Sequence, residues 1–428
     1  MTVQVARNQQ LLKNINRMAL VRHLCANPGA SRVDLAVAVG LQKSTVSSLV
    51  RELLEEGWLM ERDVVATGDL GRRPTPLFID PTRLLLLGAE VGIDSIRVVA
   101  TSLTGDVLAT SAANHDTTKT DKACVAGLAA ALLAVRKQLA RGHHKIIGIG
   151  VGLPGGVEEA SGFLHFAPNL GWRDVPFGAL LTQKLKGTAL AGVPLFVQND
   201  ADVGALGEME FSSSDAADPL LYVKLGQGVG AGVIVGQRLL TGNRGFAGEV
   251  GHIVLQINGP QCSCGRRGCA EALIGPRAML RWQEPQEPTM DDVQRRLADG
   301  DADTIRAVKK AGSYLGVLLH NLAAAYDPGC IVLSRSVADL GETYLDSARK
   351  TLNSYADAAG VAPPSVGTSR FGADSIAIGA AALVRYRLTR PLAGVASDHH
   401  QVPPEARLND GGRLSRPRQS PLASHGFR

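Results

Sequence analysis

The sequence lacks any long hydrophobic run. None of its 428 residues belongs to a stretch near the roughly 18 uninterrupted apolar residues that a membrane helix needs. The four leucines at residues 84–87 have only the length of a buried strand. A signal peptide at the start of the chain is missing as well. We therefore expect a cytoplasmic protein without a membrane partner.

Aromatic residues and net charge are also scarce. Aromatics make up 4% of the chain, against 48 glycines, a composition that favours closely packed α/β layers. The net charge is +5. Residues 1–80 carry ten Lys and Arg against eight acidic residues, and residues 389–428 carry six Arg against three. This small excess at the two ends is only weak support for nucleic-acid binding, and the length allows two or three domains.

Cysteine is rare, with six residues, yet three of them fall within eight positions and follow a histidine. The four residues are His252, Cys262, Cys264 and Cys269. Zinc prefers tetrahedral thiolate and imidazole ligands, and a closed Cys3His set is a structural site. Gly265 and Gly268 allow the short loop to turn back on itself. The alternative is a set of buried or disulfide-bonded cysteines, but disulfides need an oxidising compartment. The other three, Cys25, Cys124 and Cys330, are predicted core thiols.

Three helices are expected in the first eighty residues. The first covers about residues 8–26 and stops before Asn27-Pro28-Gly29. The second begins at Ser31, with Asp34 at capping-box spacing, and ends at Gly40. The third covers about residues 43–56 and has an apolar stripe at helical spacing. Strands are predicted at residues 58–62 and 75–79, joined by a loop that contains an Arg pair.

This order of elements is typical of a winged helix-turn-helix that binds DNA. Small polar side chains on the third helix suit base edges and phosphates, and the Arg pair at the hairpin tip suits phosphates or a narrow minor groove. The alternatives are a helical bundle for protein contacts and, for the Arg pair, a solvated linker. The predicted DNA-binding residues are Gln42, Lys43, Ser44, Thr45, Ser47, Ser48, Arg51, Arg72 and Arg73.

The cysteine cluster is preceded by a glycine-rich segment, Leu225–Gly232, with further glycines at 242, 245, 248 and 251. Together these motifs resemble the signature of the ROK family (repressors, open reading frames and kinases), over roughly residues 84–388. The resemblance implies an α/β fold in which a two-lobed, actin-like (ribonuclease-H-like) sugar-kinase domain follows the winged helix-turn-helix. It also implies one structural Zn²⁺ held by the Cys3His set.

The resemblance further implies a sugar site in the cleft between the lobes, lined by Asn169, Asn199, Asp200, Glu249, His252 and Glu271. In ROK kinases the residue at the position of Asp200 is the general base. Without the cysteine loop beside them, Asn199 and Asp200 would indicate a strand-end turn or a helix cap, which these residue types commonly form.

The nucleotide motifs of ROK kinases are degenerate. The phosphate loop, Asp-x-Gly-Gly-Thr in the kinases, contains Ile93 and Asp94 here, and a carboxylate repels a polyphosphate. Paired glycines near the adenine are replaced by a segment that includes Arg335. We therefore expect no catalytic residue and no kinase activity.

The sequence as a whole predicts a sugar-responsive transcriptional regulator, most simply a repressor. The expected parts are a DNA-binding domain at residues 1–80, a sugar-binding domain with the zinc loop at 81–388 and a disordered tail at 389–428. The expected partners are operator DNA, a sugar or sugar phosphate and further copies of the chain in a homodimer or homotetramer. The alternatives are an ATP-dependent sugar kinase, a bifunctional protein and an adaptor that does not bind DNA.

Overall fold

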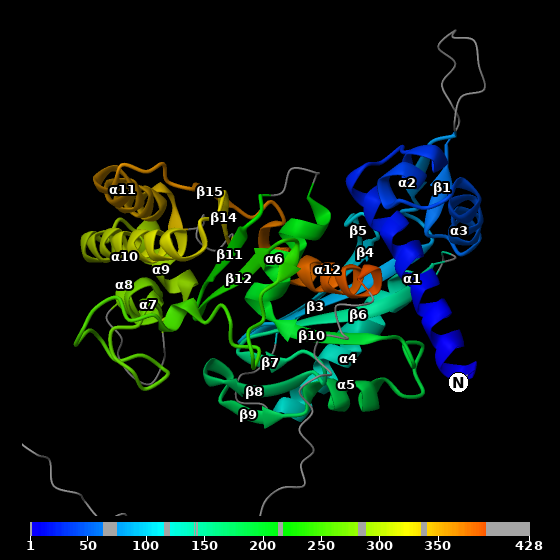
Figure 1. Cartoon of the computed structure of the whole chain (residues 1–428). Helices are drawn as coiled ribbons and strands as arrows, with labels where there is room; N and C mark the ends of the chain where they lie inside the picture. Colours follow the sequence, from blue (N-terminus) through cyan, green and yellow to red (C-terminus); the bar gives the residue numbers. More distant parts are fainter. Residues whose placement is uncertain are drawn as a thin grey trace, which may run out of the picture.

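The N-terminal segment folds as three helices and a two-stranded hairpin (Figure 1). In the computed structural model the described residues are 2–62, 75–114, 120–140, 142, 144–212, 217–280, 288–334 and 340–390, with side chains from residue 9 onward. The elements are α1 (Thr2–Ala26), α2 (Arg32–Val39), α3 (Lys43–Glu55), β1 (Leu59–Glu61) and β2 (Leu77–Ile79). The first helix thus begins earlier than expected, and the others agree with the prediction to within a residue or two.

The ends of α2 follow directly from its sequence. The Ser31 hydroxyl accepts a hydrogen bond from the Asp34 backbone N–H, and the Asp34 carboxylate accepts one from the Ser31 N–H. This is the predicted capping box. Gly40 ends the helix in the left-handed conformation, at φ 66°, where a residue with a side chain is strained.

Helix α3 buries its apolar stripe and is bent by 115° relative to α2. Val46, Val50 and Leu53 are fully buried, so the opposite face of the helix remains available to a partner. No single helix among the described residues has the length and apolar character to cross a membrane, although α2 and α3 meet that test as a bent pair.

The predicted wing is present as an antiparallel pair of strands. Leu59 of β1 lies opposite Ile79 of β2 in the ladder. The tip of this hairpin, including the predicted DNA contacts Arg72 and Arg73, lies outside the described residues.

The rest of the chain forms two lobes, and the first is built on a five-stranded sheet. The strand order is β10-β6-β3-β4-β5, in which β3, β4 and β5 form an antiparallel meander and β6 and β10 add in parallel. These strands are β3 (Leu84–Val91), β4 (Ser95–Ser102), β5 (Val107–Asn114), β6 (Lys145–Leu153) and β10 (Leu195–Asn199). A small second sheet contains β7 (Gly156–Glu158), β8 (Phe163–Ala167) and β9 (Trp172–Val175).

The second lobe repeats the topology of the first. Its strand order is β13-β12-β11-β14-β15, again an antiparallel meander of three strands followed by two parallel strands. These are β11 (Leu220–Leu225), β12 (Val229–Val235), β13 (Arg238–Leu239), β14 (Cys330–Leu333) and β15 (Ser365–Thr368). The same order in both sheets confirms the predicted two-lobed, actin-like fold.

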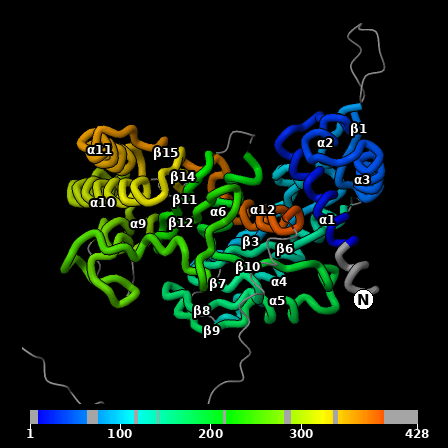
Figure 2. The backbone as a smooth tube through the Cα atoms, viewed as in Figure 1, coloured from blue at the N-terminus to red at the C-terminus, as the bar shows by residue number. Residues whose placement is uncertain are grey.

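Helices cover both sheets and fill the space between the lobes (Figures 1 and 2). Helices α4 (Asp121–Gln138) and α5 (Phe177–Leu185) cover the first sheet, and α10 (Ala302–Tyr326) and α11 (Glu342–Ala359) pack together beside the second. Helices α6 (Asp200–Phe211) and α12 (Ser375–Thr389) pack on each other between the two sheets. The short helices of the second lobe are α7 (Ala270–Ile274), α8 (Pro276–Met279) and α9 (Met290–Ala298).

Glycines in the first sheet bring α12 unusually close to it. A Cβ atom on Gly150 of β6 would lie 1.8 Å from the Ala380 carbonyl oxygen, and one on Gly88 of β3 would lie 2.0 Å from that of Ala377. Only glycine permits this approach, so α12 is held tightly against the sheet.

The N-terminal helices share a hydrophobic core with α6 and α12. Leu20 and Leu24 of α1 belong to the same buried cluster as Leu383 and Tyr386 of α12. In Figure 1, α1 runs past the end of α12. The helix-turn-helix is therefore packed directly on the two-lobed part of the chain.

Candidate functional site

The six predicted sugar contacts line one cavity of about 240 Å³. They come from the turn at Pro168–Leu170, the junction of β10 and α6, the turn at Val250–His252 and helix α7. The structure thus brings together residues that are far apart in the sequence: Asn169, Asn199, Asp200, Glu249, His252 and Glu271. A larger hollow of about 420 Å³ beside α5 contains none of the predicted site residues.

Asn199 caps helix α6 and lines the cavity as well. Its Oδ1 accepts hydrogen bonds from the backbone N–H groups of Ala201 (2.8 Å) and Asp202 (3.3 Å), while its Nδ2 donates to the Gly155 carbonyl (2.9 Å). Asn199 is therefore a helix cap, as its position in the sequence also suggested, and its contact with a sugar stays a prediction. These bonds fix the start of α6 and, with it, the position of the next residue, Asp200.

Asp200 forms an ion pair that the sequence analysis missed. Lys224 of β11 donates to its Oδ2 at 2.5 Å, and the two side chains are 26% and 7% exposed, respectively. Burial lowers the pKa of Lys224, but Asp200 and then Glu90 more than offset this, so the pKa lies above its usual value. The available signal was a lysine in an otherwise apolar strand, Leu220–Leu225, directly before the glycine-rich turn.

Two glutamates line the cavity next to the cysteine loop. Glu271 accepts from the Val229 backbone N–H (3.2 Å) and from the Ser263 hydroxyl (2.8 Å). Burial, followed by the charges of Asp200 and Glu271, raises the pKa of Glu249 to about 7. A Cβ on Gly228 would lie 3.1 Å from the Asn169 amide, so the glycine-rich turn runs directly against the site.

A further carboxyl group, Asp202, lies buried behind the cavity. Burial raises its pKa well above the usual value, and Asp200 and Glu249 add to the effect. Burial therefore disfavours the charged form of Asp202.

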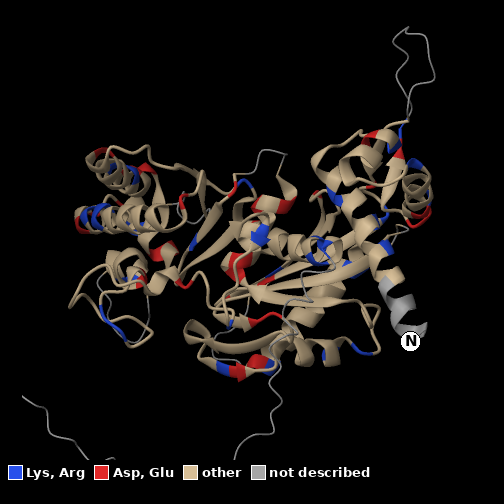
Figure 3. Cartoon of the chain, viewed as in Figure 1, with Lys and Arg blue, Asp and Glu red and all other residues tan. Residues whose placement is uncertain are grey.

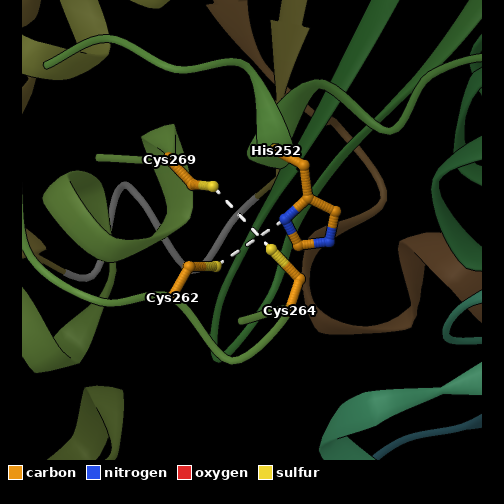
Figure 4. A group of neighbouring side chains, drawn as sticks. All are labelled: His252, Cys262, Cys264 and Cys269. Atoms are coloured by element: carbon orange, nitrogen blue, oxygen red, sulfur yellow. Dashed lines mark hydrogen bonds between the residues drawn. The ribbon is translucent and has the colours of Figure 1, made fainter. Parts of the chain in front are cut away.

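The Cys3His set forms a cluster on the second lobe (Figure 4). Its four candidate ligand atoms lie within 4.8 Å of one another, with 3.7 Å between Cys262 Sγ and His252 Nδ1 and 3.8 Å between Cys264 Sγ and Cys269 Sγ. Metal–sulfur bonds of about 2.3 Å in a tetrahedron give sulfur–sulfur edges of about 3.8 Å. The four residues therefore fit a tetrahedral metal ion.

The backbone of the loop explains how the cluster is held. Gly268 has φ 73°, and a Cβ there would lie 1.7 Å from the Gln256 carbonyl oxygen. Burial opposes ionisation of the Cys264 thiol, but hydrogen bonds from Arg266 lower its pKa overall. The cysteines outside the loop pack against cores as predicted, Cys124 fully and Cys25 and Cys330 in part.

The predicted DNA-binding face of α3 is accessible. Six of its predicted contacts are exposed: Gln42, Lys43, Ser44, Thr45, Ser47 and Arg51. Ser48 is half-buried, so it contributes less surface to this face than the others.

The segment that corresponds to the kinase phosphate loop borders the same cavity. Ile93 is half-buried and Asp94 is exposed, and both line the cavity beside Glu90. Arg335, predicted to obstruct an adenine site, lies outside the described residues.

Comparisons with known proteins agree with this architecture. The chain matches the ROK family model over residues 86–387 and a model described as winged helix-turn-helix DNA-binding over residues 13–60. A xylose repressor of Bacillus subtilis is 30% identical over 351 residues, which cover 81% of this chain and 88% of the repressor. A glucokinase of Halalkalibacterium halodurans is 36% identical over 245 residues, covering 52% of this chain and 72% of the kinase.

Among solved structures, a ROK family transcriptional regulator described as a homologue of the E. coli MLC protein has a TM-score of 0.73. The matched region covers 90% of this chain and 98% of that regulator, and the two sequences are 22% identical. At this identity the similarity is evidence for the fold only. The family match spans most of the two lobes, and the N-terminal domain matches separately. The chain therefore belongs to the ROK family and carries a winged helix-turn-helix at its N-terminus.

Proposed function

We propose that the protein is a sugar-responsive transcriptional repressor. The observation that carries this proposal is a single chain in which a winged helix-turn-helix packs on a two-lobed domain with a polar, carboxylate-lined cavity. The similarity to a xylose repressor over both parts supports it. A homodimer would present two such helices to a two-fold symmetric operator, and the protein would act in the cytoplasm, where it meets the DNA.

The cavity suits a monosaccharide. Its volume of about 240 Å³ lies below the roughly 300–1,000 Å³ of pockets for drug-sized ligands. Carboxylates accept hydrogen bonds from sugar hydroxyls, and the Asn169 amide and Lys224 ammonium can donate. In this proposal Asp200 binds a hydroxyl group and carries out no chemistry.

The cysteine loop would hold zinc as a structural ion. His252 and Glu271 are shared between the two sites: His252 is a predicted ligand, and Glu271 lies 3.6 Å from Cys262 Sγ. Zinc would therefore fix one wall of the sugar cavity, with all four protein ligands in place and no open position for catalysis.

Helix α6 offers a direct route from the sugar to the DNA-binding domain. Asp200 begins the helix in the cavity, and Glu210 lies ten residues later, about 15 Å away along the axis. Glu210 pairs with Arg385 and Arg390 at the end of α12, on which α1 packs. A sugar that binds one position of α6 better than another would shift α1 and change operator affinity.

Replacing Lys43 by alanine should weaken operator binding and reduce the salt dependence of binding by about one phosphate contact. Lys43 is exposed in the first turn of α3, where a side chain reaches the DNA backbone. Fluorescence anisotropy at several salt concentrations measures both quantities. The control is Lys309→Ala, an exposed lysine on α10, which should leave the affinity and its salt slope unchanged. Equal behaviour of the two variants would argue against α3 as the recognition helix.

The proposed function is tested by binding the protein to DNA from its own upstream region, with and without a panel of monosaccharides. Specific binding that one sugar alters is the expected result. Asp200→Asn should bind the same DNA but lose at least about tenfold in sugar affinity, because a hydrogen bond to a charged acceptor is worth about 1.5–3 kcal/mol. An Asp200→Asn protein that responds normally to the sugar would contradict the assigned site.

A sugar kinase is the second candidate because of the similarity to glucokinase. It predicts hexose-dependent consumption of ATP in the presence of magnesium, lost in the same Asp200→Asn variant. Asp94 at the phosphate-loop position opposes this reading, since it adds a carboxylate where a polyphosphate would approach. Turnover without any specific DNA binding would replace the repressor proposal by the kinase.

A further inference from the structure

The sugar cavity has almost no positive charge of its own. Among the described residues that line it, Lys224 is the only lysine or arginine. Five carboxyl groups share the lining, from both lobes and from the segment at the phosphate-loop position: Glu90, Asp94, Asp200, Glu249 and Glu271. Whether the cavity can bind an anionic ligand therefore depends on whether the charge of the Lys224 ammonium is already compensated by a neighbouring carboxylate.

The Lys224 ammonium is already paired with the Asp200 carboxylate. The two groups lie 2.5 Å apart, and the carboxylate is 7% exposed, so water screens the pair only weakly. Asp200 is fixed in turn by the Asn199 cap at the start of α6. An ammonium has three N–H donors, which leaves two for a neutral hydroxyl oxygen but no uncompensated charge for a phosphate.

The remaining charges in the cavity are negative. Burial raises the pKa of Glu90, so this group ionises less readily than an exposed glutamate. Asp94, Asp200 and Glu271 still face one lysine. A phosphate ester carries about −1.5 to −2 charge at pH 7 and would meet net repulsion here. An uncharged sugar gains hydrogen bonds from the same groups at no such cost.

We propose that Lys224 is a specificity-determining residue: as the internal counter-ion of Asp200, it restricts the cavity to uncharged sugars and excludes their phosphate esters. The inference rests on the proposed function and narrows its effector class. The same pair would hold Asp200 as an acceptor for one sugar hydroxyl and leave no cation to steady a transferring phosphate.

The first test is calorimetric titration of the full chain with uncharged sugars and their phosphates. The probes are D-xylose, D-glucose and N-acetyl-D-glucosamine, together with xylose 5-phosphate, glucose 6-phosphate and N-acetylglucosamine 6-phosphate. The uncharged form of the preferred sugar should bind at least about 100-fold more tightly than its phosphate, since tenfold corresponds to only 1.4 kcal/mol of repulsion.

The second test releases Lys224 from its partner. Asp200→Asn should raise the affinity for the sugar phosphate, relative to that for the uncharged sugar, by about tenfold or more. The reason is that the positive charge of Lys224 is no longer compensated. Adding Lys224→Met to this variant should reverse the gain. If Lys224 were only structural, the substitutions would lower both affinities together and leave their ratio unchanged. Thermal unfolding of each variant checks that it is folded.

The outcomes separate the two proposals. A phosphorylated sugar that binds as tightly as its uncharged form, or more tightly, overturns the role of Lys224 and leaves the sugar-responsive repressor standing. An unchanged ratio in Asp200→Asn also overturns it. If neither form of any sugar binds while operator DNA does, the sugar-responsive function itself fails.

Discussion

Replacing Glu210 by alanine is expected to lower the free energy of unfolding by about 3–5 kcal/mol. Glu210 accepts from Arg385 Nε at 2.8 Å and from Arg390 Nη1 at 2.5 Å, and its side chain is 6% exposed. The charged residues of α6 are acidic and those of α12 are basic, and the two helices lie side by side (Figures 1 and 3). Without the carboxylate, Arg385 and Arg390 keep their buried positive charges but lose the anion that compensates them. Removing one partner of a buried ion pair is strongly destabilising for this reason.

Chemical denaturation of the wild type and the variant measures this loss. Asp346→Ala is the control, because Asp346 faces Arg349 across 3.9 Å on α11 and is 69% exposed. Exposed pairs contribute about 0–1 kcal/mol. A Glu210 variant that loses no more than the control would show that the network does not stabilise the junction.

The same variant bears on signalling between the two parts of the chain. Arg385 also donates to the Leu103 carbonyl (2.8 Å), and its guanidinium lies over the Phe211 ring at 4.7 Å, so the network ties α6, α12 and the first sheet together. We expect Glu210→Ala to retain sugar binding but to lose the effect of sugar on operator affinity. Sugar affinity, measured separately from the DNA response, distinguishes this loss from a damaged cavity.

Replacing Cys269 by serine is expected to abolish metal binding and lower stability by several kcal/mol. Cys269 is fully buried and directly precedes helix α7, which carries Glu271 into the sugar cavity. A hydroxyl is a poor substitute for a thiolate ligand, and loss of one ligand opens the tetrahedral site. The free energy of metal binding is also free energy of folding, so the loop and this wall of the cavity should become disordered together.

Metal analysis, denaturation and sugar titration of the variant check the three consequences. The expected results are one zinc per chain in the wild type, none in Cys269→Ser, and a weaker sugar response. Cys330→Ser is the matched control, because Cys330 is a half-buried thiol in β14 outside the cluster. A Cys269 variant that keeps its zinc and its response would remove the supporting role of the loop.

Local signals in the sequence were sufficient for much of this structure. The ends of α2 are determined by contacts within a few residues, made by Ser31, Asp34 and Gly40. The three cysteines of the loop are also close in the sequence, so their spacing alone brings the thiols together. The family resemblance added the six cavity residues. Their arrangement in one cavity depends on packing of the two lobes, which no local pattern encodes.

Contacts between distant residues account for what the sequence did not reveal. Lys224 meets Asp200 only because β11 of the second lobe lies beside the start of α6, and Glu210 meets Arg385 across 175 positions of the chain. In each case the partner is determined by tertiary packing.

Because α1 and α12 share one hydrophobic core, the winged helix-turn-helix and the two-lobed part of the chain are not independent folding units. Leu20 and Leu24 are buried in the same cluster as Leu383 and Tyr386. The described residues of the N-terminal part, 9–62 and 75–80, therefore share their core with α12. The N-terminal part should then unfold cooperatively with the first lobe and not as a separate unit. A chimera that joins this winged helix-turn-helix to the two-lobed domain of another ROK protein would therefore also need the surface of α12 that packs against α1.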